Sequence, residues 1–205
     1  MESIIKSSKV IKNEYKDENG ILLAKSNITF PEMTKEFDSV SALYSDVADN
    51  FEKYIKRVIV KKASAKAKNE SFVPFGCVLK YVNTFEDERY LSIILDSHTF
   101  DGKRKSVTVR LSQVWSKDDK RIMSFRDFYK RSDRDRLVSF FTEEALKRQS
   151  EGTAEYKDNI ESLIISKTDF SRFYLVKDGI AFYFAPHEIS ENDYPDVFTD
   201  KREIN

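Results

Sequence analysis

Cysteine is almost absent from this chain, and histidine, proline and glycine are scarce. Among 205 residues there are one cysteine, two histidines, four prolines and five glycines. A single cysteine excludes an intramolecular disulfide and any zinc site built on several thiolates. The five glycines are scattered singly, so the chain has no glycine-rich loop of the kind that cradles a phosphate. Cys77 precedes the apolar pair Val78-Leu79, and we expect it to be a core residue.

Long apolar runs are also missing. No stretch reaches the ~18 apolar residues of a membrane-spanning helix, so we expect no span. The segment from Met1 to Tyr15 has no apolar core and no small-residue cleavage site of a signal peptide. The sequence thus suggests a cytoplasmic protein, or one from which a leader or anchor was removed. Lys and Arg together number 35, as do Asp and Glu, so no global basic field attracts nucleic acid.

Aromatic residues, by contrast, are abundant. The chain contains 16 Phe and 10 Tyr, and 40% of its residues are apolar. A chain of this length buries about 70% of its unfolded surface, and aromatic side chains supply large buried areas. We found no internal repeat, low-complexity tract or linker. The sequence therefore predicts a single domain, residues 1–205, with an aromatic-rich core.

Alternating apolar residues and turn signals predict a β-hairpin at each end of the chain. Asn19-Gly20 separates the predicted strands 10–15 and 21–30. Near the C-terminus, Lys177-Asp178-Gly179 separates strands 173–176 and 180–184, and Phe182 and Phe184 are expected to point into the core. Three further strands are predicted as a meander, at 78–84, 89–100 and 103–115.

Two long helices complete the predicted elements. Between 37 and 62, apolar residues recur at spacings of three and four, a stripe that includes Tyr44, Tyr54 and Ile55. A second helix is predicted at 134–149, after a short helical turn at 124–129. We therefore predict an α+β fold, with an antiparallel sheet packed against two long helices and a hairpin at each end.

The residues show no catalytic motif. Asp96 and His98 would share a face of a strand, an arrangement that also suits a surface pair. His187-Glu188 begins like a zinc-protease motif, but the position four residues after His187 is Glu191, so the second histidine is missing. The residues by themselves therefore indicate no metal site, no cofactor and no complete catalytic set.

Four short sequences occur along the chain in an order that is also found in a known family of domains. They are Ile28-Thr29-Phe30-Pro31 after the first strand pair, Tyr90-Leu91-Ser92-Ile93 in the middle, Ile122 to Phe128 before the second helix, and Phe173 to Ile189. This layout resembles the paired bacterial domains of RsiV-type anti-sigma factors and PdaC-like peptidoglycan deacetylases, shared with a secreted mycobacterial antigen. The resemblance implies a PdaC-like half at about 1–115 and an RsiV-like half at about 116–205.

The resemblance also implies a function and a place. It predicts a secreted or cell-envelope protein that binds, without catalysis, a protein such as lysozyme or a cell-wall glycan. The chain departs from the family pattern in two loops, where ligand specificity is usually determined. From these loops we predict a binding surface made of Ser97, His98, Thr99, Phe100, Asp101, Lys103, Arg104, His187, Glu188 and Tyr194.

Two alternatives remain open from the sequence. The first is a hydrolase of wall polymers that uses Asp96, His98 and Glu188 as its catalytic residues. The second is a structural or oligomerising domain with no ligand. Composition does not exclude the first, because Asp and Glu together number 35 and could supply a pair of catalytic carboxylates.

Overall fold

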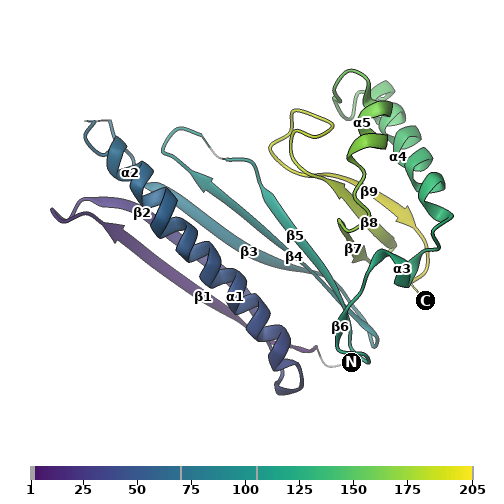
Figure 1. Cartoon of the computed structure of the whole chain (residues 1–205), viewed down its shortest axis with the longest axis horizontal. Helices are drawn as coiled ribbons and strands as arrows, with labels where there is room; N and C mark the ends of the chain where they lie inside the picture. Colours follow the sequence, from purple (N-terminus) through teal and green to yellow (C-terminus); the bar gives the residue numbers. More distant parts are fainter. Residues whose placement is uncertain (1–2, 70, 105, 205) are drawn as a thin grey trace. The chain divides into compact units, whose positions relative to one another are not determined.

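The computed structural model describes residues 3–69, 71–104 and 106–204. It is a mixed α+β fold in which sheets pack against helices, as the sequence predicts (Figure 1). The chain divides into two compact units, Met1–Val82 with Leu95–Val107 and Asn83–Ile94 with Thr108–Asn205. Each unit is described separately below, and the assignment of the chain to a single domain stays a prediction.

The first unit contains the predicted N-terminal hairpin. Its elements are β1 (Ile5–Lys16), β2 (Leu22–Met33), α1 (Asp38–Tyr54), α2 (Val60–Lys66), and parts of β3 (Phe75–Glu86) and β4 (Tyr90–Phe100). Strands β1 and β2 are antiparallel, and the Asp17 carboxylate closes their turn by accepting the backbone N–H groups of Asn19 and Ile21. Strands β2 and β3 pair in parallel, Ala24 opposite Phe75, because the long helix connects them.

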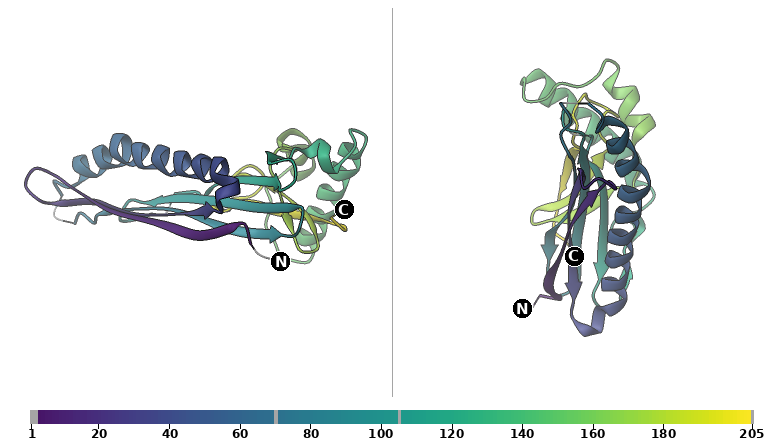
Figure 2. Two further views of the ribbon diagram at one scale, coloured as in Figure 1. Left: turned by 90° about the horizontal axis from the view of Figure 1, so that it is seen from below. Right: turned by 90° about the vertical axis from the view of Figure 1, so that its left-hand side faces the viewer.

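The predicted long helix is confirmed. A π-helical turn, Ile55–Ile59, joins α1 to α2 without a break, and both helices pack over β2 (Figure 2). Its buried stripe consists of Val40, Tyr44, Ala48, Ile55, Ile59 and Ala63. Tyr54, predicted to belong to this stripe, is 43% exposed. Consecutive residues of a helix point in directions about 100° apart. Because Ile55 points toward the sheet, the preceding residue Tyr54 points away from it.

Cys77 lies on β3 and is buried, as the sequence predicts. Burial raises the pKa of its thiol to about 11, so only about one thiol in a thousand is ionised at pH 8. We expect Ellman's reagent to modify the native protein at least about 100-fold more slowly than the protein in guanidinium chloride. Equal rates in the two conditions would show that the thiol is accessible in the native fold.

The second unit contains the end of β3, the start of β4 and everything that follows residue 107. Its further elements are β5 (Val109–Ser116), β6 (Arg121–Ile122), α3 (Phe125–Phe128), α4 (Asp133–Ser150), α5 (Ile160–Lys167), β7 (Phe173–Val176), β8 (Gly179–Phe184) and β9 (Asp196–Lys201). The predicted C-terminal hairpin is confirmed, with Phe173 opposite Phe182 and Val176 opposite Gly179. β9 adds a third antiparallel strand to this sheet.

The core of the second unit is rich in phenylalanine, as predicted. Phe182 and Phe184 point inward, and both contact the ring of Phe141 from α4. Phe198 of β9 closes the same cluster, with its ring centroid 5.7 Å from that of Phe141. Such tilted and edge-to-face contacts are the geometry that aromatic pairs prefer. Among the described residues, no helix is long and apolar enough to cross a membrane.

One predicted strand begins later than expected. The segment 103–115 was predicted as a single strand, but β5 starts only at Val109. Gly102 has a φ of +86°, and the Asp101 carboxylate accepts the backbone N–H groups of Lys103 and Arg104. This turn occupies backbone donors that a strand would use for its ladder, which moves the start of β5 along the chain.

Candidate functional site

The first predicted loop lies in the first unit. Ser97, His98, Thr99 and Phe100 form the end of β4, and Asp101, Lys103 and Arg104 follow in the loop. Asp101 accepts a hydrogen bond of 2.6 Å from Lys66 Nζ at the end of α2. That bond, with those from the loop backbone, holds the pKa of Asp101 well below its usual range. The carboxylate thus fixes the loop, while the side chains of Lys103 and Arg104 are exposed.

The second predicted segment lies in the other unit. His187 has a φ of +64°, and its ring nitrogens lie 3.7 Å from Glu191 and 3.2 Å from Asp193. Glu188 Oε2 accepts the Ala185 N–H at 2.8 Å and an Arg172 N–H at 2.6 Å. These bonds give Glu188 a structural role, because they close the turn that follows β8.

The residues predicted for the alternative hydrolase function are also divided between the two units. Asp96 is buried and His98 half-buried on β4 in the first unit, whereas Glu188 belongs to the second. Among the described residues, no group of three or more His, Cys, Asp or Glu side chains is arranged to hold a metal ion. Catalysis by this set stays a prediction.

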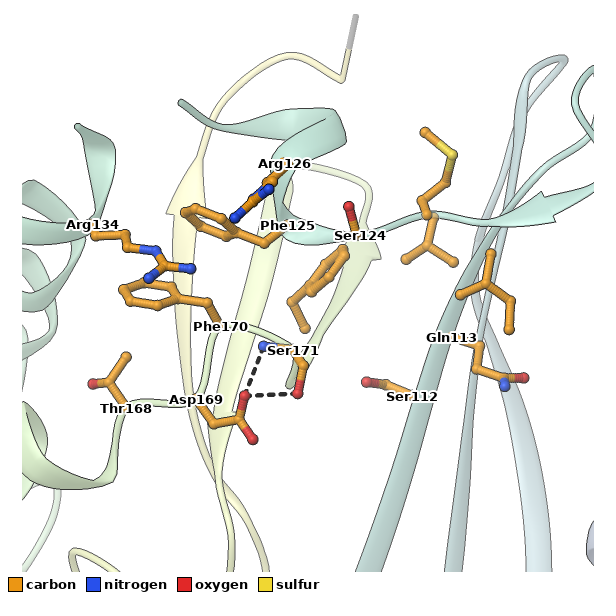
Figure 3. A pocket seen from close by; sticks show the side chains of 14 residues that line it. Ser112, Gln113, Ser124, Phe125, Arg126, Arg134, Thr168, Asp169, Phe170 and Ser171 are labelled. Atoms are coloured by element: carbon orange, nitrogen blue, oxygen red, sulfur yellow. Dashed lines mark hydrogen bonds between the residues drawn. The ribbon is translucent and has the colours of Figure 1, made fainter. Parts of the chain in front are cut away.

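A cavity of about 630 Å³ in the second unit is the more developed site (Figure 3). Its walls come from β5, β6, the start of α3, the start of α4 and the loop between α5 and β7. The lining residues are Ser112, Gln113, Val114, Ile122, Met123, Ser124, Phe125, Arg126, Arg134, Thr168, Asp169, Phe170, Ser171 and Phe173. We call this cavity the Phe125 pocket.

The short helix α3 is held in place by its own first turn. Ser124 and Asp127 form a capping box, in which Asp127 Oδ2 accepts the Ser124 N–H at 2.6 Å and its hydroxyl at 2.8 Å. Arg121 of β6 donates two further hydrogen bonds to the same carboxylate, at 2.7 and 3.2 Å. Chiefly because of the Arg121 bonds, the pKa of Asp127 stays well below its usual value. This network fixes the position from which Phe125 and Arg126 extend.

The opposite wall is a tight loop ordered by Asp169. Its Oδ1 accepts the Ser171 N–H at 2.9 Å and the Ser171 hydroxyl at 2.7 Å. Burial alone would raise the pKa of Asp169, but these bonds and the charge of Arg172 outweigh it and lower the pKa. Asp169 is therefore an ionised carboxylate that is already occupied, and it holds Phe170 against Phe125 with ring centroids 4.7 Å apart.

Two arginines stand beside this aromatic wall. The Arg134 guanidinium lies 5.6 Å from the centre of the Phe125 ring and 5.2 Å from that of Phe170. Figure 3 shows Arg126 on the same side of the pocket, close to Phe125. Both side chains are exposed, and neither forms an ion pair within the part of the chain that the structure describes. The pocket thus combines apolar rings with uncompensated positive charge.

This combination favours recognition over chemistry. The described residues that line the pocket include no histidine or cysteine and only one carboxylate, the occupied Asp169. General acid–base hydrolysis of a glycan needs two carboxyl groups that face each other across the bond to be cleaved. Guanidinium groups above aromatic rings instead bind carboxylate or phosphate oxygens and the apolar group attached to them.

The sequence did not identify this pocket as a site. Phe125 and Arg126 were assigned to a helical turn, and Arg134 to the beginning of a helix. The available signal was the run from Lys130 to Arg136, in which four of seven residues are basic. Charge runs are usually solvated helix faces, and the aromatic partner Phe170 is distant in sequence.

Comparisons with known proteins show the fold of the chain. No family model matches the sequence, and no curated protein is similar to it in sequence. Solved structures that are similar in three dimensions include two bacterial proteins. One is a DUF3298-family protein from Bacteroides fragilis, with a TM-score of 0.57, 11% identity, and coverage of 98% of this chain and 92% of the other. The second is a DUF3298-family protein from Pseudomonas aeruginosa, with a TM-score of 0.56, 11% identity, and coverage of 90% and 84%. At this identity the likeness shows that the chain has the fold of these bacterial domains of unknown function.

Proposed function

We propose that the chain is a non-catalytic binding module of the bacterial cell envelope, and that its Phe125 pocket takes an anionic group of a cell-wall glycan. One observation carries the proposal. Arg126 and Arg134 are exposed beside the aromatic pair Phe125 and Phe170, and within the described part of the chain no carboxylate forms an ion pair with them. Arginine in such a position binds planar oxyanions through paired N–H donors.

The charge of the pocket favours a glycan over a lysozyme-like protein. Peptidoglycan fragments carry free carboxylates on the stem peptide, or on the lactyl group where no peptide is attached, next to apolar acetyl and alanyl methyl groups. These methyl groups suit the phenylalanine wall, and the carboxylates suit the arginines. A protein partner would have to present an acidic side chain at the same place, since like charges placed opposite each other oppose binding. The envelope location rests on the resemblance to the RsiV and PdaC domains.

Calorimetric titration with soluble disaccharide–peptide fragments of peptidoglycan tests this proposal. We expect fragments with free carboxylates to bind at least about tenfold more tightly than the same fragments after amidation, a difference of about 1.4 kcal/mol. Arg134→Gln should weaken binding of the free-carboxylate fragment by about tenfold, because a charge-assisted hydrogen bond is lost.

Arg131→Gln is the matched control. Arg131 is an exposed arginine on the same segment that does not line the pocket, so its substitution should leave affinity unchanged. Urea unfolding of both variants separates lost binding from lost structure. Lysozyme is titrated in parallel. The glycan assignment is wrong if lysozyme binds with an affinity that Arg134→Gln leaves unchanged while the peptidoglycan fragments do not bind. Absence of binding to either ligand would refute the proposed function.

A further inference from the structure

A second cavity, of about 440 Å³, lies beside the Phe125 pocket in the same unit. It is lined by Arg126, Asp127, Phe128, Tyr129, Lys130, Asp133, Arg136 and Arg202. We call it the Arg202 groove. Half of its lining side chains are cationic, and nothing in the proposed binding of a single anionic group makes use of them.

The carboxylates of the groove are already occupied. The Asp127 carboxylate accepts hydrogen bonds from Arg121 and from the backbone N–H of Ser124, the N-cap of α3. Arg121 itself does not line the groove. Asp133 Oδ2 accepts the backbone N–H of Lys130 at 2.7 Å. Asp127 is therefore paired with a cation outside the groove, whereas Asp133 keeps its negative charge, which acts on Arg136. The four cationic side chains of the groove still outnumber its two carboxylates.

In the part of the chain that the structure describes, Arg136 is the only groove cation in an ion pair, with its nitrogens 3.0 and 3.2 Å from the Asp200 carboxylate. Arg202 donates a hydrogen bond of 3.2 Å to the Phe128 carbonyl and lies 4.8 Å from the centre of the Tyr129 ring. These contacts orient the Arg202 guanidinium, and its charge contributes to the lowered pKa of Asp200. Within the described ranges, Arg126, Lys130 and Arg202 have no carboxylate in ion-pair contact. The groove thus has positive charge in excess.

Arg126 joins the two cavities, because it lines both of them. The Phe125 pocket has apolar rings and Arg134, whereas the Arg202 groove has mainly charged side chains. A ligand that enters the pocket with one anionic group can place its next anionic group in the groove, with Arg126 between them. Two linked contacts of this kind raise the affinity, since the second forms at a high effective concentration.

We infer that the Phe125 pocket and the Arg202 groove form one extended site for an oligoanionic chain, which carries carboxylate or phosphodiester groups on successive units. The inference rests on the proposed function, because it uses the same pocket and adds to it a second position for charge. It also predicts binding that weakens steeply with salt, since several exposed charges are involved.

Two pairs of probes test the inference and distinguish carboxylate from phosphate. Galacturonic acid is compared with oligogalacturonate, and glycerol phosphate with poly(glycerol phosphate). We expect at least one oligomer to bind at least about tenfold more tightly than its monomer when the concentration is expressed per repeat unit. Lys130→Gln should remove most of this gain and leave monomer affinity unchanged. Arg202→Gln is a second variant of the groove, and Arg131→Gln is the control outside both cavities.

The outcomes separate the two proposals. If Arg134→Gln weakens monomer binding but both oligomers bind no more tightly than their monomers, the extended site is refuted and the proposed function stands. If Lys130→Gln and Arg202→Gln leave oligomer affinity unchanged, the groove takes no part and the inference is equally refuted. If no monomer, oligomer or peptidoglycan fragment binds, both proposals fail. A thymidine oligonucleotide that binds more tightly than every other probe would refute an envelope polymer as the ligand.

Discussion

Replacing Phe141 with alanine is expected to lower the free energy of unfolding of the second unit by about 3–5 kcal/mol. Phe141 is fully buried on α4, and its ring contacts Phe182 of β8 and Phe198 of β9, with centroids 5.3 and 5.7 Å away. Truncation removes buried apolar area and leaves a cavity between helix and sheet. Both parts of the cost are large here, because neighbouring rings on two strands cannot collapse together into the space.

Phe140→Ala is the control for this prediction. Phe140 is the neighbouring phenylalanine on the same helix, but it is only partly buried. The same chemical change should there cost less than about 2 kcal/mol. Urea unfolding followed by tryptophan fluorescence and by circular dichroism measures both variants. A Phe140→Ala variant as unstable as Phe141→Ala would contradict the assignment of Phe141 to the centre of the core.

The fold class was predictable because local patterns were strong. The helical stripe between Val40 and Ile59 repeats over several turns, and the turns at Asn19-Gly20 and Asp178-Gly179 define both hairpins. Such signals depend only on neighbouring residues. The parallel pairing of β2 with β3 depends instead on a helical connection between distant segments, and no local pattern in the sequence indicated it.

Strand β9 was missed because charged residues occupy its inward positions. Asp196 and Asp200 are both buried, so the strand does not show the usual apolar alternation. Asp196 accepts the Ser190 hydroxyl at 2.6 Å, and Asp200 accepts hydrogen bonds from Tyr129 and Arg136. Such burial requires hydrogen-bond partners, and those of Asp200 lie far away in sequence, so no single segment reveals them.

The candidate site was missed for a related reason. Its aromatic wall joins Phe125 to Phe170, two residues from separate elements, and its charge comes from arginines that each resemble a solvated helix residue. Sequence reasoning placed function in the loops that depart from the family pattern. That prediction of Ser97 to Arg104 and His187 to Tyr194 is still untested, and the residues now fall in two different units.

Gly179→Ala is the second substitution with a large expected effect, about 2–5 kcal/mol of lost stability. Gly179 has a φ of +155° and begins β8, where it pairs with both Val176 and Lys201. A β-carbon there would overlap the carbonyl oxygen of Asp200 and lie 3.0 Å from Lys201 Cα. Both obstacles are backbone atoms, so no side-chain rotation can relieve the overlap, and β9 has to move.

Gly152→Ala isolates the steric part of this effect. Gly152 also has a positive φ, +67°, but a β-carbon there would meet no atom within 4 Å. Its substitution should cost only about 1 kcal/mol, the strain of the backbone conformation alone. Equal losses in the two variants would show that the approach of β9 to Gly179 does not limit stability.

The consequence of Gly179→Ala should reach the Phe125 pocket through β7. Phe173 pairs with Phe182 across the hairpin and also lines the Phe125 pocket, so a shift of β8 moves one wall of that pocket. Hydrogen exchange should therefore become faster in β8 and β9 first, and in the pocket loop from Thr168 to Phe173 as well. Exchange that becomes faster in β9 alone would show that the pocket wall is held independently of the hairpin. The Asp178-Gly179 turn, detectable in the sequence as a local signal, would then affect the stability of the sheet without affecting the site.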